Sequence, residues 1–410
     1  MDIAGACWHQ FEPAVPDDRD QLIGTRHLNA RLAVDHLRLA RAEGVGPVTY
    51  RRLLQRYGSP AAALDALPQL ARAGGRRGAP AVPSVGRAER EIAALERIGA
   101  RMLVLDQPDY PPLLALIEDA PPVMALLGNV DALSMRAVAI VGGRNASANG
   151  KRMAEGLARE LAAAGFSIVS GLARGVDAAA HRGALQAGRT VAAIAGGLDH
   201  PYPPENAGLQ AEITAGGAVV AEAPLGTAPQ ARHFPRRNRI IAGLALGVVV
   251  VEAAPRSGSL ITARMAQEYG RELFAVPGSP LDPRCRGSND LIRQGAQLTE
   301  TLADVLDTLP DHPLRQGLSR APLFARGPPP GPDEPPPQAV EPPERPRDMP
   351  AVRTHVLDLL GPSPTSVDDL IRGCQFSPAA VMATLLELEL AGRVETLPGN
   401  RVTLVADHGQ

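Results

Sequence analysis

The sequence is poor in lysine, aromatic residues, cysteine and long apolar runs. Lys151 is the only lysine among 42 basic residues, and a net charge of −2 gives no support for nucleic-acid binding by the molecule as a whole. Any anion site must therefore be a local cluster of arginines. The cysteines Cys7, Cys285 and Cys374 lie far apart and form no disulfide framework. The longest apolar stretch, 240–251, is shorter than the roughly 20 residues of a membrane-spanning helix.

The length of 410 residues predicts about two or three domains. With 40 prolines and 41 glycines, the chain has more of both than compact elements need, so part of it must be linker. We predict a flexible tail (1–25), a helical domain (26–85), an α/β domain (86–310), a proline-rich linker (311–350) and a carboxyl-terminal domain (351–410). Because no basic start followed by an apolar run opens the chain, we expect no secretory signal and a cytoplasmic location.

The amino-terminal region predicts a helical hairpin. Apolar residues recur at helical spacing over residues 28–39, the turn Gly44-Val45-Gly46-Pro47 interrupts them, and a second helix follows over residues 49–57. The turn resembles that of helix-hairpin-helix modules, whose backbone N–H groups can face phosphate. A hairpin that only packs on its neighbour explains the pattern equally well.

The middle of the chain alternates short apolar runs with helical stretches, which is typical of a parallel sheet with crossover helices. Several runs are apolar at every position, as strands buried on both faces are. A doubly wound sheet binds ligands at the carboxyl ends of its strands, so the loops after them are the candidate site. The predicted strands span 137–141, 166–170, 191–195, 218–221, 248–251 and 273–276.

The carboxyl-terminal block reads as a helix, a short helix from Ser366, a longer helix from Ser377 and two strands around Pro398-Gly399-Asn400. This order predicts a winged helix. The presumed recognition helix, 377–391, carries Glu387 and Glu389 but no lysine or arginine, whereas a helix that reads the major groove needs cations or amides. We therefore expect this module to contact protein, or the rest of the chain, instead of duplex DNA.

The first two loops of the sheet are rich in glycine and contain one arginine each. Their candidate binding residues are Gly143 and Arg144 in the first loop, and Ser170, Gly171, Arg174 and Gly175 in the second. Backbone N–H groups of such loops at a positive helix end suit a phosphate. The first loop fails both the Walker and the G-x-G-x-x-G spacing, so neither an ATPase nor a dinucleotide cofactor is implied.

Asp177 and His181 follow the second loop at i and i+4 of the same predicted helix, so they share a face and could hydrogen-bond. They could form a catalytic acid–base pair or a metal site, but a structural pair is favoured. We expect no cofactor and no bound metal.

The run from Arg232 to Arg239 is the strongest local signal, with four arginines and one aromatic residue in eight positions. A charge run usually marks a solvated face, but the nearby buried strand places this one beside the crevice. Guanidinium groups bind phosphate oxygens in bidentate fashion, and an aromatic face can stack an unpaired base. The combination predicts a site for single-stranded nucleic acid, with candidates Phe234, Arg236, Arg237, Asn238 and Arg239.

Two further loops add smaller candidates. Gly197 lies in the loop after the third strand, beside the turn Tyr202-Pro203-Pro204-Glu205-Asn206. After the strand at 248–251, Ser257, Gly258, Ser259 and Thr262 open a helix and could hold a phosphate. The two serines could instead cap that helix.

Together these strings resemble the DNA-processing protein A family (DprA, also called Smf). They are Ser170-Gly171-Leu172-Ala173-Arg174-Gly175-Val176-Asp177, the stretch from Phe234 to Gly243, Ser257-Gly258-Ser259-Leu260-Ile261-Thr262-Ala263 and Phe274-Ala275-Val276-Pro277-Gly278. The resemblance implies an extended Rossmann-like parallel sheet with an N-terminal SAM-like or helix-hairpin-helix-like module and a C-terminal winged helix. It also implies single-stranded DNA binding, dimerisation through the Rossmann-like domain and delivery of the strand to a RecA-type recombinase in natural transformation.

Carried onto this chain, the resemblance has Arg144, Arg236, Arg237 and Arg239 hold the DNA backbone while Phe234 stacks on a base. Two departures weaken individual contacts. Gly143 stands where relatives often have a hydroxyl residue, so a donor is lost, and Pro204 stands where some relatives have a basic residue.

An enzyme is the alternative from another class, because such sheets also resemble the lysine-decarboxylase-like phosphoribohydrolases. Their P-G-G-x-G-T-x-x-E pattern, aligned on Ser257, places Thr262 at the threonine but Met265 at the catalytic glutamate. A methionine performs no acid–base chemistry, so a non-enzymatic binder is favoured.

Overall fold

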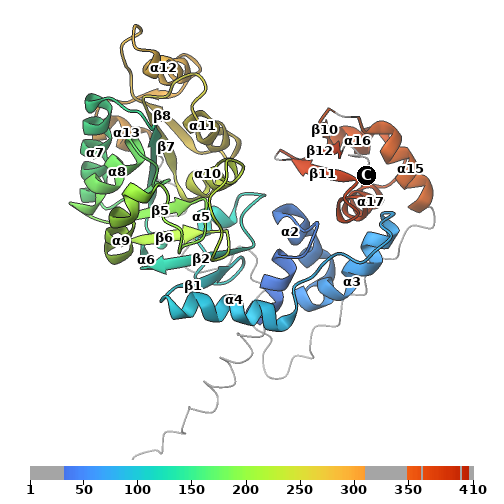
Figure 1. Ribbon diagram of the computed structural model, residues 1–410. Helices are drawn as coiled ribbons and strands as arrows, with labels where there is room; N and C mark the ends of the chain where they lie inside the picture. Colours follow the sequence, from blue (N-terminus) through green and yellow to red (C-terminus); the bar gives the residue numbers. More distant parts are fainter. Residues whose placement is uncertain (1–31, 310–348, 362, 398, 406–410) are drawn as a thin grey trace, which may run out of the picture.

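The computed structural model describes residues 32–309, 349–361, 363–397 and 399–405. They form a Rossmann-like domain, a helical module and a winged helix (Figure 1). The predicted tail (1–25) and most of the predicted linker (311–350) lie outside the described residues. In the part of the chain that is described, no helix is both long enough and apolar enough to cross a lipid bilayer.

The Rossmann-like domain is built on a sheet of nine strands in the order β1-β2-β6-β5-β4-β3-β7-β8-β9. The seven strands from β6 to β9 run parallel, while β1 and β2 add to one end as antiparallel strands. Strands β3 to β6 extend in one direction and β7 to β9 in the other, so the order reverses between β3 and β7. The strands are β1 Arg101–Val104, β2 Val123–Gly128, β3 Ala137–Gly142, β4 Ser167–Ser170, β5 Thr190–Ile194, β6 Ala218–Ala221, β7 Gly247–Val251, β8 Glu272–Ala275 and β9 Gln297–Leu298.

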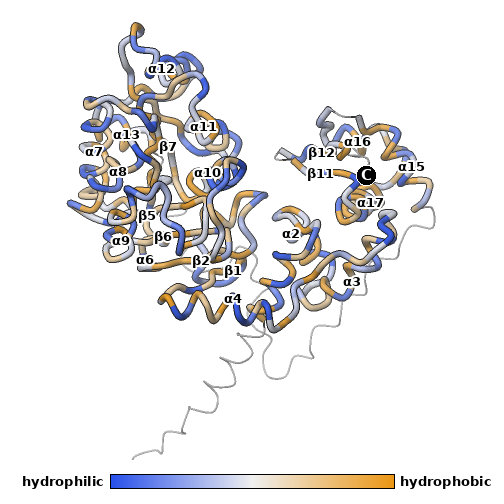
Figure 2. Tube along the Cα trace, in the orientation of Figure 1, coloured by the Kyte–Doolittle hydropathy of each residue, from blue (hydrophilic) through white to orange (hydrophobic). Residues whose placement is uncertain are grey.

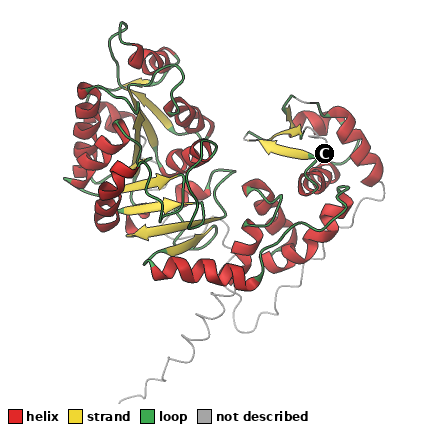
Figure 3. Ribbon diagram, viewed as in Figure 1, coloured by secondary structure: helices red, strands yellow, loops and turns green. Residues whose placement is uncertain are grey.

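Helices cover both faces of this sheet (Figure 3). They are α4 Val85–Arg97, α5 Pro112–Ala115, α6 Asp131–Ser134, α7 Ala148–Ala163, α8 Val176–Leu185, η1 Pro204–Asn206, α9 Ala207–Gly216, α10 His233–Leu244, α11 Ser259–Glu268, η2 Pro283–Cys285, α12 Arg286–Arg293 and α13 Leu302–Thr308.

Strand β3 is apolar throughout because helices cover both of its faces. Val138 and Ile140 pack in one core cluster with residues of α7 and α8, whereas Ala139 and Val141 pack in another with residues of α10 and α11. Because successive side chains of a strand point to opposite faces, a strand covered on both sides needs apolar residues at every position. Figure 2 shows hydrophobic segments along the strands and more hydrophilic ones on the outer helices.

The two smaller modules match the predicted order of elements. The helical module has a helix over residues 32–40, then α2 Pro47–Tyr57 and α3 Pro60–Ala73. The winged helix contains α15 Met349–Leu359, β10 Thr365–Ser366, α16 Val367–Gly373, α17 Pro378–Leu390, β11 Val394–Leu397 and β12 Arg401–Leu404. The predicted fold class is confirmed: a large, mostly parallel sheet with a helical module before it and a winged helix after it. Strands β1, β2 and β9 were not predicted.

Candidate nucleic-acid interface

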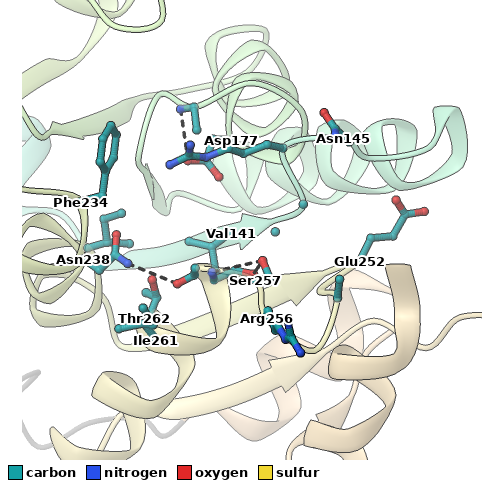
Figure 4. A pocket seen from close by; sticks show the side chains of 18 of the residues that line it. Val141, Asn145, Asp177, Phe234, Asn238, Glu252, Arg256, Ser257, Ile261 and Thr262 are labelled. Carbon is teal, nitrogen blue, oxygen red and sulfur yellow. Dashed lines mark hydrogen bonds between the residues drawn. The ribbon is translucent and has the colours of Figure 1, made fainter. Parts of the chain in front are cut away.

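A pocket of about 490 Å³ opens where the strand order reverses, at the carboxyl ends of β3 and β7. Strand-order reversal leaves a crevice because the two flanking loops turn away to opposite sides of the sheet. The wall is formed by the loops after β3 and β7 and by the first turns of α10 and α11. Figure 4 looks into this pocket, with Asp177, Phe234, Asn238, Ser257 and Thr262 around it.

Gly175 lets the first two glycine-rich loops meet at the edge of this pocket. Its φ is 79°, which favours glycine, and a Cβ there would lie 2.2 Å from the Gly143 carbonyl oxygen. The Val176 amide donates to the same oxygen at 3.3 Å. Gly175 therefore supports the Arg144 loop without itself lining the pocket.

Phe234 and Arg144 form the rim of the pocket. The Arg144 guanidinium carbon lies 4.9 Å from the centre of the Phe234 ring, and the centre of the Tyr202 ring lies 5.6 Å from the centre of the Phe234 ring. Arg144 is exposed and Phe234 is half-buried. An arginine over an aromatic face is attracted to the ring, and its N–H groups remain available to other acceptors.

Arg237 lies beneath Phe234 and is buried. Its Nη1 group donates to the carbonyl oxygens of Gly171 and Ala193, at the ends of β4 and β5. Burial lowers the pKa of Arg237 to about 10, and the neighbouring Asp177 carboxylate opposes this shift. Arg237 therefore links the pocket to the ends of β4 and β5. Its buried guanidinium is less accessible to a DNA backbone than that of the exposed Arg144.

Arg236 and Arg239 do not line the pocket and both pair with Glu222, which follows β6. Arg236 donates to the Glu222 carboxylate at 2.6 and 3.1 Å, and Arg239 donates to it at 2.6 Å. The Arg239 side chain is only 4% exposed and also faces Asp119 at 3.9 Å, whereas Arg236 is 60% exposed. The expectation that Arg239 holds a DNA backbone is therefore corrected: its guanidinium is enclosed by protein carboxylates.

The amino terminus of α7 is also different from expectation. The Glu252 carboxylate, from the end of β7, accepts hydrogen bonds from the Ser147 amide at 2.7 Å and from the Ser147 hydroxyl. A Cβ on Gly150 would meet this carboxylate at 2.5 Å. The positive helix end that seemed suited to a phosphate thus already binds the protein's own anion.

The amino terminus of α11 forms the opposite wall and does line the pocket. The hydroxyls of Ser257 and Ser259 are 2.6 Å apart, and Asn238 donates to the Gly258 carbonyl oxygen at 3.3 Å. The N-cap residue of this helix, Gly258, has no capping side chain, but the Ser257 hydroxyl accepts a hydrogen bond from the Ser259 amide at 3.4 Å. Arg256 and Arg284, both exposed, also line the pocket, although the sequence did not single them out, and Arg284 is paired with Asp282 at 2.7 Å.

The structure thus brings nine of the predicted residues together in the pocket. These are Gly143, Arg144, Phe234, Arg237, Asn238, Ser257, Gly258, Ser259 and Thr262. Seven others lie outside it: Ser170, Gly171, Arg174, Gly175, Gly197, Arg236 and Arg239. Two of them have other partners: the Ser170 hydroxyl donates to the Ile140 carbonyl at 2.7 Å, and Arg174 pairs with Glu205 at 3.6 Å.

Asp177 and His181 do not pair with each other. Asp177 accepts a hydrogen bond from the Ala173 amide at 3.3 Å, while His181 Nδ1 bonds to the Thr190 hydroxyl at 2.7 Å. That hydroxyl donates to the Ile168 carbonyl, so His181 must donate from Nδ1 and keep Nε2 unprotonated. Both side chains are buried, and burial raises the pKa of Asp177.

His181 should make stability depend on pH. Burial lowers its pKa from 6.5 to about 3, so only the unfolded chain takes up this proton between those values, and stability must fall as pH decreases from 6.5 toward 3. The contribution reaches at most about 1.4 kcal/mol per pH unit. In thermal melts across this range, His181→Gln should reduce the slope without removing it, because burial also lowers the pKa of His36 to about 4. The exposed control His200→Gln should keep the original slope.

Comparison with known proteins agrees with this architecture. The family model described as DNA recombination-mediator protein A matches residues 101–310. A DprA-like N-terminal HHH domain matches residues 30–94, and a DprA winged helix domain matches residues 330–400. The chain is 39% identical over 318 residues to Protein Smf of Escherichia coli, which covers 77% of this chain and 80% of the relative.

Two solved structures are also similar. DNA processing protein A from Streptococcus pneumoniae is 38% identical, with 68% of this chain and 97% of that chain covered and a TM-score of 0.58. A structure from Helicobacter pylori, whose title describes the single-stranded DNA binding mode of DNA processing protein A, is 32% identical, covering 51% and 95% with a TM-score of 0.47.

The fold and the pocket define a Rossmann-like protein with a pocket at the strand-order reversal, extended by a helical module and a winged helix. The chain belongs to the DprA/Smf family of DNA recombination-mediator proteins.

Proposed function

We propose that this chain binds single-stranded DNA in the pocket at the ends of β3 and β7 and acts as a recombination mediator. The pairing of Arg144 with Phe234 carries the proposal, because it sets a phosphate-binding group 4.9 Å from a surface on which a base can stack. A single strand offers both a phosphate and an unstacked base. A duplex keeps its bases stacked inside, so it would gain only the charge contacts.

The phosphate contacts are assigned to the exposed arginines around the pocket. Arg144, Arg256 and Arg284 line it directly, and Arg236, which pairs with Glu222 but is 60% exposed, directly follows the lining residue Pro235 at the start of α10. The hydroxyls of Ser257 and Ser259 add neutral donors on the α11 side. These groups contact backbone and not base edges, so sequence preference should be weak.

A binding titration with a single strand, a duplex of the same length and a mononucleotide tests the proposal. The single strand should bind most tightly. About four phosphate contacts give a salt slope of about −2.8, so affinity should fall roughly 50-fold between 50 and 200 mM salt. Equal affinity for single strand and duplex, or strongest binding of the mononucleotide, would contradict the proposal.

A non-enzymatic role is part of the proposal. Met265 on α11, at the position where phosphoribohydrolases have their catalytic glutamate, is partly buried and packs against the apolar core. Its thioether can neither accept nor donate a proton in catalysis. Incubation with nucleoside monophosphates should therefore release no ribose phosphate, and release above the rate of a heat-inactivated sample would favour the enzyme instead.

Family membership supports two further parts of the proposal: a cytoplasmic homodimer formed through the Rossmann-like domain, and delivery of the strand to a RecA-type recombinase in natural transformation. Strand β9 ends the sheet and pairs only with β8 among the described strands, and Leu298 on it is 43% exposed. Open edge strands with exposed apolar residues favour pairing with a second copy. Leu298→Lys should shift the sedimenting species toward monomer, and a recombinase pull-down tests the second part.

A further inference from the structure

Helix α17, the helix that reads DNA in many winged helices, has apolar residues on two faces. One face packs inside the winged helix, where Leu385 and Leu388 join its own core. The other face packs against the helical module: Leu386 and Leu390, 3% and 0% exposed, belong to the same core cluster as residues of α2 and α3. A helix that is apolar all round is buried on all sides. Figure 1 shows α17 lying next to α3 although about 300 residues separate them in sequence.

The two helices touch at backbone level. Gly74 caps α3, and a Cβ added there would lie 1.9 Å from the carbonyl oxygen of Glu387 on α17. Arg353, on α15 of the winged helix, donates a hydrogen bond to the Ala73 carbonyl. Apolar packing and a hydrogen bond thus act in one contact.

The same contact reaches the glycine turn of the hairpin. A Cβ on Gly44 would lie 3.5 Å from the Leu390 carbonyl oxygen and 3.7 Å from that of Glu389. The carboxyl-terminal turn of α17 therefore lies beside Gly44, which stays exposed. Two elements with shapes suited to nucleic acid, the hairpin turn and the third helix of a winged helix, face each other.

We propose that α17 is a protein-docking helix whose partner is the helical module of the same chain, and that docking closes this helix to nucleic acid. The dock joins the first and last modules while the Rossmann-like pocket stays open, because no residue of α2, α3 or α17 lines that pocket. The inference is independent of the ligand proposed for the pocket.

The experiment uses the full chain with a protease site inserted within residues 325–340. After cleavage, the two fragments should still migrate together on size exclusion at micromolar concentration. Gly74→Ala should raise their dissociation constant at least ~10-fold, about 1.4 kcal/mol, since the new methyl group meets backbone that cannot yield without moving α17. The matched control is Gly78→Ala, because a Cβ at Gly78 meets nothing within 4 Å.

A second pair of variants approaches the contact from the other side. Leu386→Asp on α17 should also release the fragment, whereas Ala379→Asp, exposed in the first turn of the same helix, should not. Separation of the wild-type fragments, or undiminished association in both Gly74→Ala and Leu386→Asp, would overturn the proposal. Single-strand affinity should stay within twofold in all four variants, so a failure of the pocket assignment would be recognised separately.

Discussion

Replacing Glu222 with glutamine is expected to lower the free energy of unfolding by about 3–5 kcal/mol, the usual cost of removing one partner of a buried ion pair. The Glu222 side chain is 11% exposed and binds both Arg236 and Arg239. Without its charge, the guanidinium of Arg239 keeps only Asp119, at 3.9 Å, as a carboxylate partner. An uncompensated buried charge costs more than the pair contributed, because water cannot reach it.

Denaturant unfolding of the wild type and the variant measures this loss. Glu205→Gln is the matched control, since Glu205 pairs with Arg174 at 3.6 Å while both side chains are more than half exposed. Exposed pairs contribute at most about 1 kcal/mol, so the control should change little. Similar losses in the two variants would show that the ion pairs of Glu222 stabilise the fold no more than the exposed pair of Glu205 does.

The same carboxylate should make stability sensitive to acid. Burial alone would raise the pKa of Glu222, but the charges of Arg239 and Arg236 outweigh it and hold the pKa below 4.5. A carboxyl group with a depressed pKa in the folded state stabilises above its unfolded pKa, and this contribution is lost as pH falls through the folded value. The wild type should therefore lose more stability than Glu222→Gln below about pH 4.5.

The sequence predicted the parallel strands well because burial on both faces imposes an unbroken apolar run. It did not reveal β1 and β2. Strand β2 reads V-M-A-L-L-G, a short apolar run that periodicity cannot distinguish from buried helix, and β1 reads R-M-L-V, which begins with an exposed arginine. Both join the sheet as antiparallel additions, whose partners are set by tertiary contacts.

The sequence indicated which residues form the candidate site better than it predicted where their side chains point. In the arginine run, positions 236 and 239 are one helical turn apart and share a face toward Glu222, whereas position 237 points into the sheet. Nothing local to the run indicates that a carboxylate after β6 supplies the counter-charge. Glu252 could have been found, because an acidic residue directly after a buried strand at the strand-order reversal lies beside a helix amino terminus.

Arg144→Ala is expected to weaken single-strand binding about 10- to 150-fold at 50 mM salt, from the roughly 1.5–3 kcal/mol of a hydrogen bond to a charged group. Fluorescence anisotropy with a labelled strand measures the change. Because Arg144 is exposed, folding should be unaffected. The control is Arg159→Ala, which removes the same charge from an exposed position on α7 that does not line the pocket, and should change affinity less than threefold.

The salt dependence separates the two parts of the rim. Arg144→Ala should make the salt slope about 0.7 less steep, the value for one lost phosphate contact on a single strand. Phe234→Ala should weaken binding about 5- to 150-fold, from the roughly 1–3 kcal/mol of one stacked base, with the slope nearly unchanged. Steric loss of the pocket would reduce affinity in both variants alike, so only two different slopes assign charge recognition to Arg144 and base stacking to Phe234. A common slope would mean that the pair acts as one packing unit and that the phosphate contacts lie elsewhere around the pocket.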